Sequence, residues 1–212
     1  MSHVCLACKE NPKAPEMKGI NDEATLRALV PRYREAVEKA ALLFCLVENK
    51  GINYSSVFNL LLGPLDEAAR GMLMRRLRPA MPSNLRDRER WLGPSLSRVE
   101  AGTKTRYLEM AQNLKRTLVS NRVIMPIGLL RSCIYYAIND DTKIDGVFRT
   151  VRNQFNVIGG RELLSTVERI YEFRNTRVAH QEKEVTDPTE AQQHLVLWIK
   201  GLKALTLTGP LQ

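Results

Sequence analysis

The sequence predicts an all-α protein of roughly seven to nine helices. Apolar residues recur at the three- and four-residue spacing of a helix along most of the chain, and no segment alternates convincingly as a strand does. Hydrophobic residues make up 44% of the 212 residues, which is enough for a real core and argues against disorder. No internal repeat or low-complexity tract interrupts this pattern.

A polar tail and one long helix are expected first. Residues 1–20 are polar and show no periodicity. Residues 22–48 then place apolar side chains along one helical stripe, with Asn21 or Asp22 available as the N-cap. Pro31 should either kink this helix or mark a second start, because proline cannot continue the hydrogen bonding of the preceding turn.

Two shorter helices and a loop follow. Residues 53–63 predict a helix that ends at Gly63, and Pro64 predicts the first turn of another helix that extends to about Arg78. The prolines and the Ser-Asn pair of residues 79–84 then predict a loop.

Three further helices are expected in the middle of the chain. Residues 94–120 predict a long helix that begins at a Pro-Ser pair, and residues 126–139 predict the next one. Residues 140–155 predict a third, with Asp140 or Asp141 as its cap.

The last two helices have the clearest signals. The glycine pair 159–160 precedes a helix that carries the stretch Tyr171–His180. The final helix should begin with Asp187 as the N-cap, Pro188 at its first position and Glu190 at its third. His194 lies beside the apolar stripe of this helix and is expected to be a packed histidine rather than a catalytic one.

The charge of the chain indicates an acidic partner. The formal net charge is +9 and the isoelectric point is about 9.6, which favours nucleic acid first and an anionic membrane surface second. Residues 70–90 hold five of these nine net charges, because seven arginines there face only two acidic residues. Arginine suits bidentate contacts with phosphate; the alternative is a solvated basic face or a network of salt bridges between domains. The seven candidates are Arg70, Arg75, Arg76, Arg78, Arg86, Arg88 and Arg90.

The sequence gives no sign of a membrane or a secretory pathway. No run reaches the roughly 18 apolar residues of a membrane span, and the N-terminus does not have the form of a signal peptide. Cys45 and Cys133 lie within apolar helical patterns, which indicates a reducing compartment rather than a disulfide framework. We therefore expect a soluble, cytoplasmic protein.

No metal or cofactor site is expected. His3, Cys5 and Cys8 supply half of a zinc knuckle, but the second half is missing, so any metal there would need ligands from a second chain. The chain has no glycine-rich phosphate loop, no dinucleotide fingerprint and no nucleophile elbow. It is therefore not an ATPase, a dinucleotide enzyme or a serine hydrolase of a common type.

An arginine occupies an unusual position near the end of the penultimate helix. At 100° per residue, Arg174 lies within about 20° of Leu163 on the helical wheel, and Val167 belongs to the same apolar stripe. A guanidinium is rare there unless it is paired. Its structural role would be an ion pair with a carboxylate of a neighbouring helix. In that case His180 would only end the helix.

The stretch Arg174 to His180, "RNTRVAH", resembles the signature of the HEPN superfamily. That signature is an arginine, usually followed by a polar residue such as asparagine, and a histidine after four to six intervening residues. The resemblance implies a helical bundle at residues 95–208, preceded by the tail 1–20 and a helical extension at 22–92.

The chemistry that the resemblance implies is metal-independent cleavage of RNA. Arg174 would hold the scissile phosphate, His180 would act as general acid and base, and Asn175 would orient one of these groups. Arg177 would be a second phosphate contact or would have no role. Six residues on a straight helix separate Arg174 and His180 by about 120°, so the helix must end or bend, or two copies must meet. The family resemblance implies a homodimer with both motifs at one cleft.

The biological setting implied by the family is a toxin–antitoxin, abortive-infection or antiviral defence system. The partners would be RNA, a second copy of the chain, and an antitoxin or a larger defence complex. Gln181, Glu182 and Lys183 stand where toxins paired with a small nucleotidyltransferase usually carry a tyrosine, so that pairing is not supported. The alternative is a non-catalytic helical module that binds nucleic acid or a protein within a helicase or restriction complex.

Overall fold

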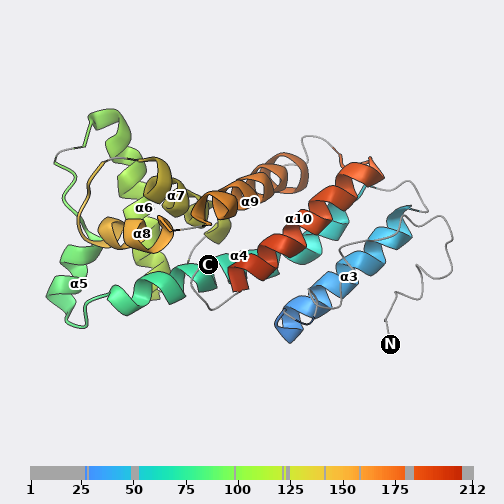
Figure 1. The fold of residues 1–212 in the computed structure, drawn as a ribbon, viewed down its shortest axis with the longest axis horizontal. Helices are drawn as coiled ribbons and strands as arrows, with labels where there is room; N and C mark the ends of the chain where they lie inside the picture. Colours follow the sequence, from blue (N-terminus) through green and yellow to red (C-terminus); the bar gives the residue numbers. More distant parts are fainter. Residues whose placement is uncertain are drawn as a thin grey trace. The chain divides into compact units, whose positions relative to one another are not determined.

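The structure is a computed structural model that describes residues 27, 29–48, 53–97, 99–120, 122, 125–140, 142–157, 159–179 and 184–206. These residues form eight α-helices and no strand, which confirms the all-α class (Figure 1). In chain order the helices are α3 Pro31–Glu48, α4 Ser55–Leu77, α5 Leu85–Leu92, α6 Ala101–Ser120, α7 Pro126–Asn139, α8 Val147–Phe155, α9 Gly160–Phe173 and α10 Pro188–Thr206. Within the described ranges, no helix combines the length and apolar character needed to cross a membrane.

The chain divides into two compact units. The division falls between Ala68 and Ala69, inside α4, and between Val167 and Glu168, inside α9. The first unit contains α3, the start of α4, the end of α9 and α10; the second contains the rest of α4, α5 to α8 and the start of α9. The extension at 22–92 and the bundle at 95–208 have a different boundary and stay a prediction.

Aromatic side chains form the centre of the first unit. Phe58 of α4 contacts Phe173 of α9 and Trp198 of α10 edge to face, with ring centroids 4.8 and 5.0 Å away. Phe44 of α3 lies 5.0 Å from the ring of Tyr54. All five side chains are at most 4% exposed. Phe173, the residue that precedes Arg174, is therefore fixed in the core.

A second aromatic cluster organises the second unit. Tyr107 of α6, Tyr136 of α7 and Phe148 of α8 meet edge to face, with centroids between 5.1 and 5.8 Å apart. Before α8, Gly146 has a φ of 67°, and a Cβ there would lie 2.5 Å from the carbonyl oxygen of Trp91. Only glycine suits this position, because it tolerates both the positive φ and the close approach.

Helix α4 corrects the prediction of two helices separated at Gly63. It runs without interruption from Ser55 to Leu77 with Pro64 inside it. Pro64 removes one hydrogen bond to the carbonyl four residues earlier. Leu60, which carries that carbonyl, lies on the exposed side of the helix. The buried stripe continues on both sides of Pro64, from Leu61 to Leu65, so packing outweighs the local break.

Two other predicted starts are wrong. Residues 94–97 are not helical, and α6 begins at Ala101. The side chain of Leu96 is buried and its carbonyl accepts the N–H of Val99 at 3.2 Å, so this stretch forms an anchored turn. Similarly, α8 begins at Val147 and not at 140. Asp140 accepts the N–H of Thr142 at 2.9 Å and so forms a turn of its own.

Other element predictions have mixed outcomes. Helix α3 begins at Pro31, so this residue is a start and not a kink. Residues 126–139 form α7 as predicted, and α10 begins at Pro188 with the N–H of Thr189 donating to the side chain of Asp187 at 2.9 Å. Helix α5 was not predicted, although Asn84 caps it by accepting the N–H of Asp87 at 2.8 Å.

The two buried cysteines differ. Cys133 is a free thiol whose pKa is raised by burial. Cys45 is disulfide-bonded, which differs from the expectation that the buried cysteines stay outside any disulfide.

Candidate active segment and nucleic-acid interface

The helix that carries the motif changes geometry where its functional residues begin. α9 ends at Phe173, and Arg174–Ala179 continues as a π-helical segment, η2. Such turns, with hydrogen bonds from residue i to i+5, are rare and occur frequently at functional sites. Asn175 and Arg177 therefore share this widened turn with Arg174. His180 lies outside the described residues.

Two hydroxyl groups bind main-chain carbonyls around the π turn. Thr176 donates to the carbonyl of Glu172 at 2.9 Å, a local bond that competes with regular helical hydrogen bonding. Ser55, which is 4% exposed at the start of α4, donates to the carbonyl of Arg177 at 3.1 Å. The second bond connects residues 122 positions apart in the sequence and so ties η2 to the fold.

Arg174 has a carboxylate partner on a neighbouring helix. Its Nη2 lies 3.4 Å from Oδ2 of Asp66 in α4, and the two side chains are 14% and 24% exposed. Its Nη1 donates to Oδ1 of Asn175 at 3.4 Å. Asn175 and Asp66 therefore both orient the guanidinium, and the structural role considered for Arg174 is present in the molecule.

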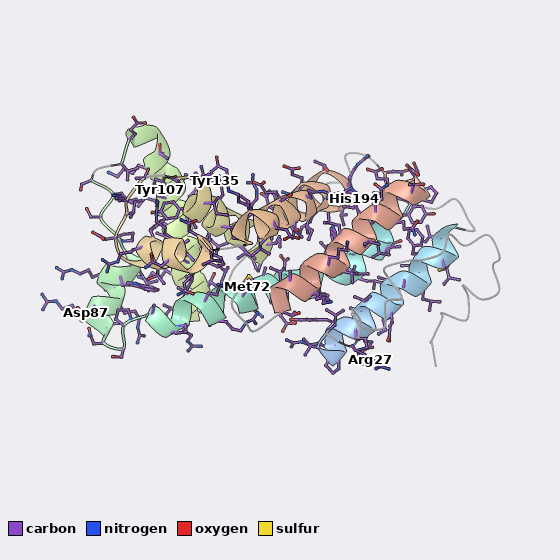
Figure 2. The ribbon with its side chains drawn as sticks, viewed as in Figure 1. Arg27, Met72, Asp87, Tyr107, Tyr135 and His194 are labelled. Carbon is purple, nitrogen blue, oxygen red and sulfur yellow. The ribbon has the colours of Figure 1, made fainter. Side chains whose placement is uncertain are left out.

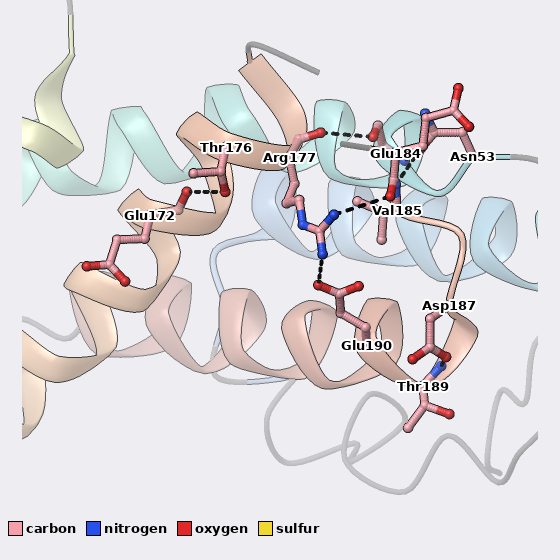
Figure 3. A network of polar contacts seen from close by, with 10 residues as sticks. Asn53, Glu172, Thr176, Arg177, Glu184, Val185, Asp187, Thr189 and Glu190 are labelled. Carbon is pink, nitrogen blue, oxygen red and sulfur yellow. Dashed lines mark hydrogen bonds and ion pairs between the residues drawn. The ribbon is translucent and has the colours of Figure 1, made fainter. Parts of the chain in front are cut away.

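Arg177 connects the π turn to the start of α10 (Figure 3). Its Nη2 lies 2.8 Å from Oε1 of Glu190, with side chains 24% and 30% exposed, and its Nη1 donates to the carbonyl of Glu184 at 3.5 Å. Glu190 occupies the third position of α10, where a capping glutamate would reach back to the helix start. Glu190 instead pairs with Arg177, so it joins two elements.

The start of α4 completes this network (Figure 3). Oδ1 of Asn53 accepts the N–H of Ser55 at 2.9 Å and the N–H of Val185 at 3.2 Å. The N–H of Tyr54 donates to the carbonyl of Val185 at 2.8 Å. The segment before α10 is thus held on the start of α4. Sequence reasoning did not identify Asn53, Ser55 or Asp66 as parts of the site, because their partners are more than 100 residues away.

His194 packs beside the motif on α10 (Figure 2). Its ring stacks on Phe173 with centroids 3.7 Å apart and an interplanar angle of 16°. Burial lowers the pKa of His194, the carboxylate of Glu190 opposes this, and the charges of Arg169 and Arg177 reinforce it. Burial therefore favours the neutral ring, and its stack on Phe173 agrees with the packed histidine expected from the sequence.

The arginines of residues 70–90 fall into different environments. Arg76 donates to the carbonyl of Gln154 at 2.9 Å and lies over the ring of Phe155, and burial followed by the charge of Arg75 lowers its pKa. Arg88 donates to the carbonyls of Pro82 and Ser83 at 3.1 and 2.7 Å. Arg76 and Arg88 therefore stabilise the fold through hydrogen bonds to main-chain carbonyls. Arg70 is half-buried, and the side chains exposed to solvent are those of Arg75, Arg78, Arg86 and Arg90.

The two units differ in net charge. Residues 69–167 contain eighteen lysines and arginines against eight acidic residues, a net charge of +10. The rest of the chain contains fourteen basic and fifteen acidic residues, a net charge of −1. The basic excess of the protein thus belongs to the second unit, whereas Arg174 and Arg177 belong to a nearly neutral first unit.

Metal ligands and similarity to known proteins give no further indication of function. Across the described ranges, no group of three or more histidine, cysteine or acidic side chains could hold a metal ion. The N-terminal candidates His3, Cys5 and Cys8 lie outside those ranges. Comparisons with family models, with curated proteins and with solved structures found no match.

Proposed function

We propose that the protein binds RNA through its second unit and cleaves it, without a metal, through the motif Arg174, Asn175 and His180, as an endoribonuclease of the HEPN type. The observation that carries RNA binding is the separation of charge, +10 in the second unit against −1 elsewhere. A polyanion is the partner that such a field attracts. Arg75, Arg78, Arg86 and Arg90 are the exposed arginines that contact phosphates.

The proposed roles follow from the surroundings of each motif residue. Asp66 and Asn175 hold Arg174 so that its guanidinium can take the scissile phosphate. The 3.4 Å separation from Asp66 exceeds the roughly 2.7–2.9 Å of a strong charge-assisted bond, so a phosphate can compete with this carboxylate. His180 moves the protons of the reaction. Arg177 is a structural link to Glu190, because its nitrogen lies 2.8 Å from that carboxylate.

A dimer completes the proposed site, and a defence or toxin function within the cell is its setting. Two copies of the motif at a C2 interface would supply both an arginine and a histidine to one phosphate. Light scattering at micromolar concentration should therefore give about twice the chain mass of 24.1 kDa. A monomer at all concentrations would remove the shared site.

The second candidate is a module that binds RNA without cleaving it. One observation favours it: the arginines at 174 and 177 both form ion pairs within the first unit. Such pairs can account for both residues as architecture.

RNA cleavage in the presence of EDTA separates the two candidates. Wild-type protein should cleave single-stranded RNA and leave 2′,3′-cyclic phosphate ends. His180→Ala should lose roughly 10²–10⁴ in rate while it retains RNA binding. Arg169→Ala, which removes an exposed arginine from α9, is the control and should keep most activity. Cleavage that survives in His180→Ala, or that EDTA abolishes, would contradict the proposed chemistry.

A further inference from the structure

The second unit contains one arginine–aromatic pair that differs from the rest. Within the described ranges, an arginine guanidinium lies over an aromatic ring at Tyr33, Phe155, Tyr135 and Tyr136. The rings of Tyr33, Phe155 and Tyr136 are at most 4% exposed and belong to the core. Tyr135 on α7 is partly exposed (Figure 2). The guanidinium of Arg106 lies 5.1 Å from its ring centroid.

A polar network around Asp140 lies near Arg106 in the second unit. Burial alone would raise the pKa of Asp140, but hydrogen bonds from Tyr107 and Thr142 and the charge of Arg106 hold it below its usual range. Tyr107 is 1% exposed, so the network is anchored in the core. An ionised Asp140 and the ring of Tyr135 both attract the positive charge of Arg106. The exposed guanidinium therefore lies over the ring before any ligand arrives.

We propose that Tyr135 and Arg106 form a stacking platform for a base of single-stranded RNA. This inference rests on the proposed RNA binding and names the form of RNA that the second unit selects. Aromatic rings and guanidinium planes stack on unpaired bases, whereas the bases of a duplex are stacked on one another and do not offer their faces. The net charge of +10 supplies the attraction for the backbone.

The other aromatic side chains of this unit do not offer the same surface. Tyr107, Tyr136, Phe148 and Phe155 are buried. Trp91 is partly exposed, but no arginine–ring contact is found at it within the described ranges. Tyr135 is thus the described ring of this unit that combines exposure with an oriented guanidinium.

The test compares Tyr135→Ala with Tyr135→Phe on two labelled probes, a single-stranded oligouridylate RNA and an RNA duplex of equal length. One stacked base contributes about 1–3 kcal/mol, so Tyr135→Ala should weaken single-strand binding roughly 5- to 150-fold. Duplex binding should change less than about twofold, because phosphate contacts remain. Tyr135→Phe keeps the ring and should bind both probes like the wild type. Equal weakening on both probes, or none on the single strand, would overturn the platform.

A second measurement uses only the wild-type protein, so its result does not depend on whether a variant folds. Wild-type protein should crosslink to single-stranded RNA that carries 5-iodouridine, and mass spectrometry should find the crosslink on Tyr135. Crosslinks confined to other residues would overturn the inference. The outcomes also separate this inference from the proposed function. RNA binding that is unchanged in Tyr135→Ala would contradict the stacking platform but not RNA binding. A wild-type protein that binds neither probe removes RNA binding itself.

Discussion

The ion pair between Arg174 and Asp66 should stabilise the fold more than a shorter pair nearby. Two unit charges 3.4 Å apart attract by about 5 kcal/mol at an effective dielectric constant of about 20, before the costs of desolvation and side-chain ordering. With side chains 14% and 24% exposed, the pair lies between a surface bridge, worth about 0–1 kcal/mol, and a buried one, whose rupture costs about 3–5 kcal/mol. We expect a coupling free energy of about 1–3 kcal/mol.

Helix α4 offers a matched control at the next position. Glu67 lies 2.7 Å from Arg32, closer than Asp66 is to Arg174, but these side chains are 35% and 63% exposed. Solvent should reduce the coupling of this pair to below about 1 kcal/mol despite the shorter distance. Burial should therefore outweigh separation.

Urea denaturation of two double-mutant cycles measures both couplings. One cycle combines Arg174→Met with Asp66→Asn, and the other combines Arg32→Met with Glu67→Gln. Equal couplings, or a stronger one for Arg32 and Glu67, would refute the argument from burial. Applied to RNA cleavage, Arg174→Met also separates the two roles of this residue. A loss of cleavage greater than the measured loss of stability explains indicates catalysis, and lost stability without a measurable wild-type activity indicates architecture.

Two further predictions concern the basic surface and the packed histidine. Arg86→Ala combined with Arg90→Ala should reduce the magnitude of the slope of log binding constant against log salt by about two and leave the thermal midpoint unchanged. Arg76→Ala should instead lower the thermal midpoint, because the carbonyl of Gln154 loses its donor. Titration of RNA binding at several salt concentrations and thermal melts check this, and an unchanged slope would make the surface a solvated face. The pKa of His194 is lower in the folded protein than in the unfolded chain, so the unfolded chain binds this proton more tightly. The free energy of unfolding should therefore be highest above about pH 6.5 and should fall as the pH drops below that value. His194→Phe, which keeps the stack on Phe173, should reduce that loss between about pH 7.5 and pH 5.5 in urea denaturation; an identical loss in both proteins would contradict it.

Local signals predicted the fold class and some element starts well. Pro188 and its cap Asp187 marked the start of α10, because proline at the first position and an acceptor before it satisfy helix-start geometry without distant partners. The same local rules failed at Pro64, where a continuous buried stripe keeps α4 intact. Packing between distant segments decided that outcome, and a single sequence does not show such packing.

The candidate site could be predicted only in part, again because a single sequence does not show how distant segments pack. The position of Arg174 on an apolar stripe indicated that it needs a partner, and Asp66 is such a partner. The choice of Asp66 over other carboxylates depends on how α4 and α9 pack. Within the π turn, the carbonyl of Arg177 accepts a hydrogen bond from Ser55, a distant partner that no short-range pattern reveals.

The points at which the chain passes between its two units have a consequence for dissecting the protein. Both points lie inside helices, α4 and α9, and not in linkers. Proteases prefer exposed loop tips, so a limited digest should cut within a unit and should not release either unit whole. A truncation at 68 or 168 would likewise cut a helix and expose its apolar stripe. The proposed RNA binding and the proposed cleavage are therefore better separated by point substitutions than by expressing fragments.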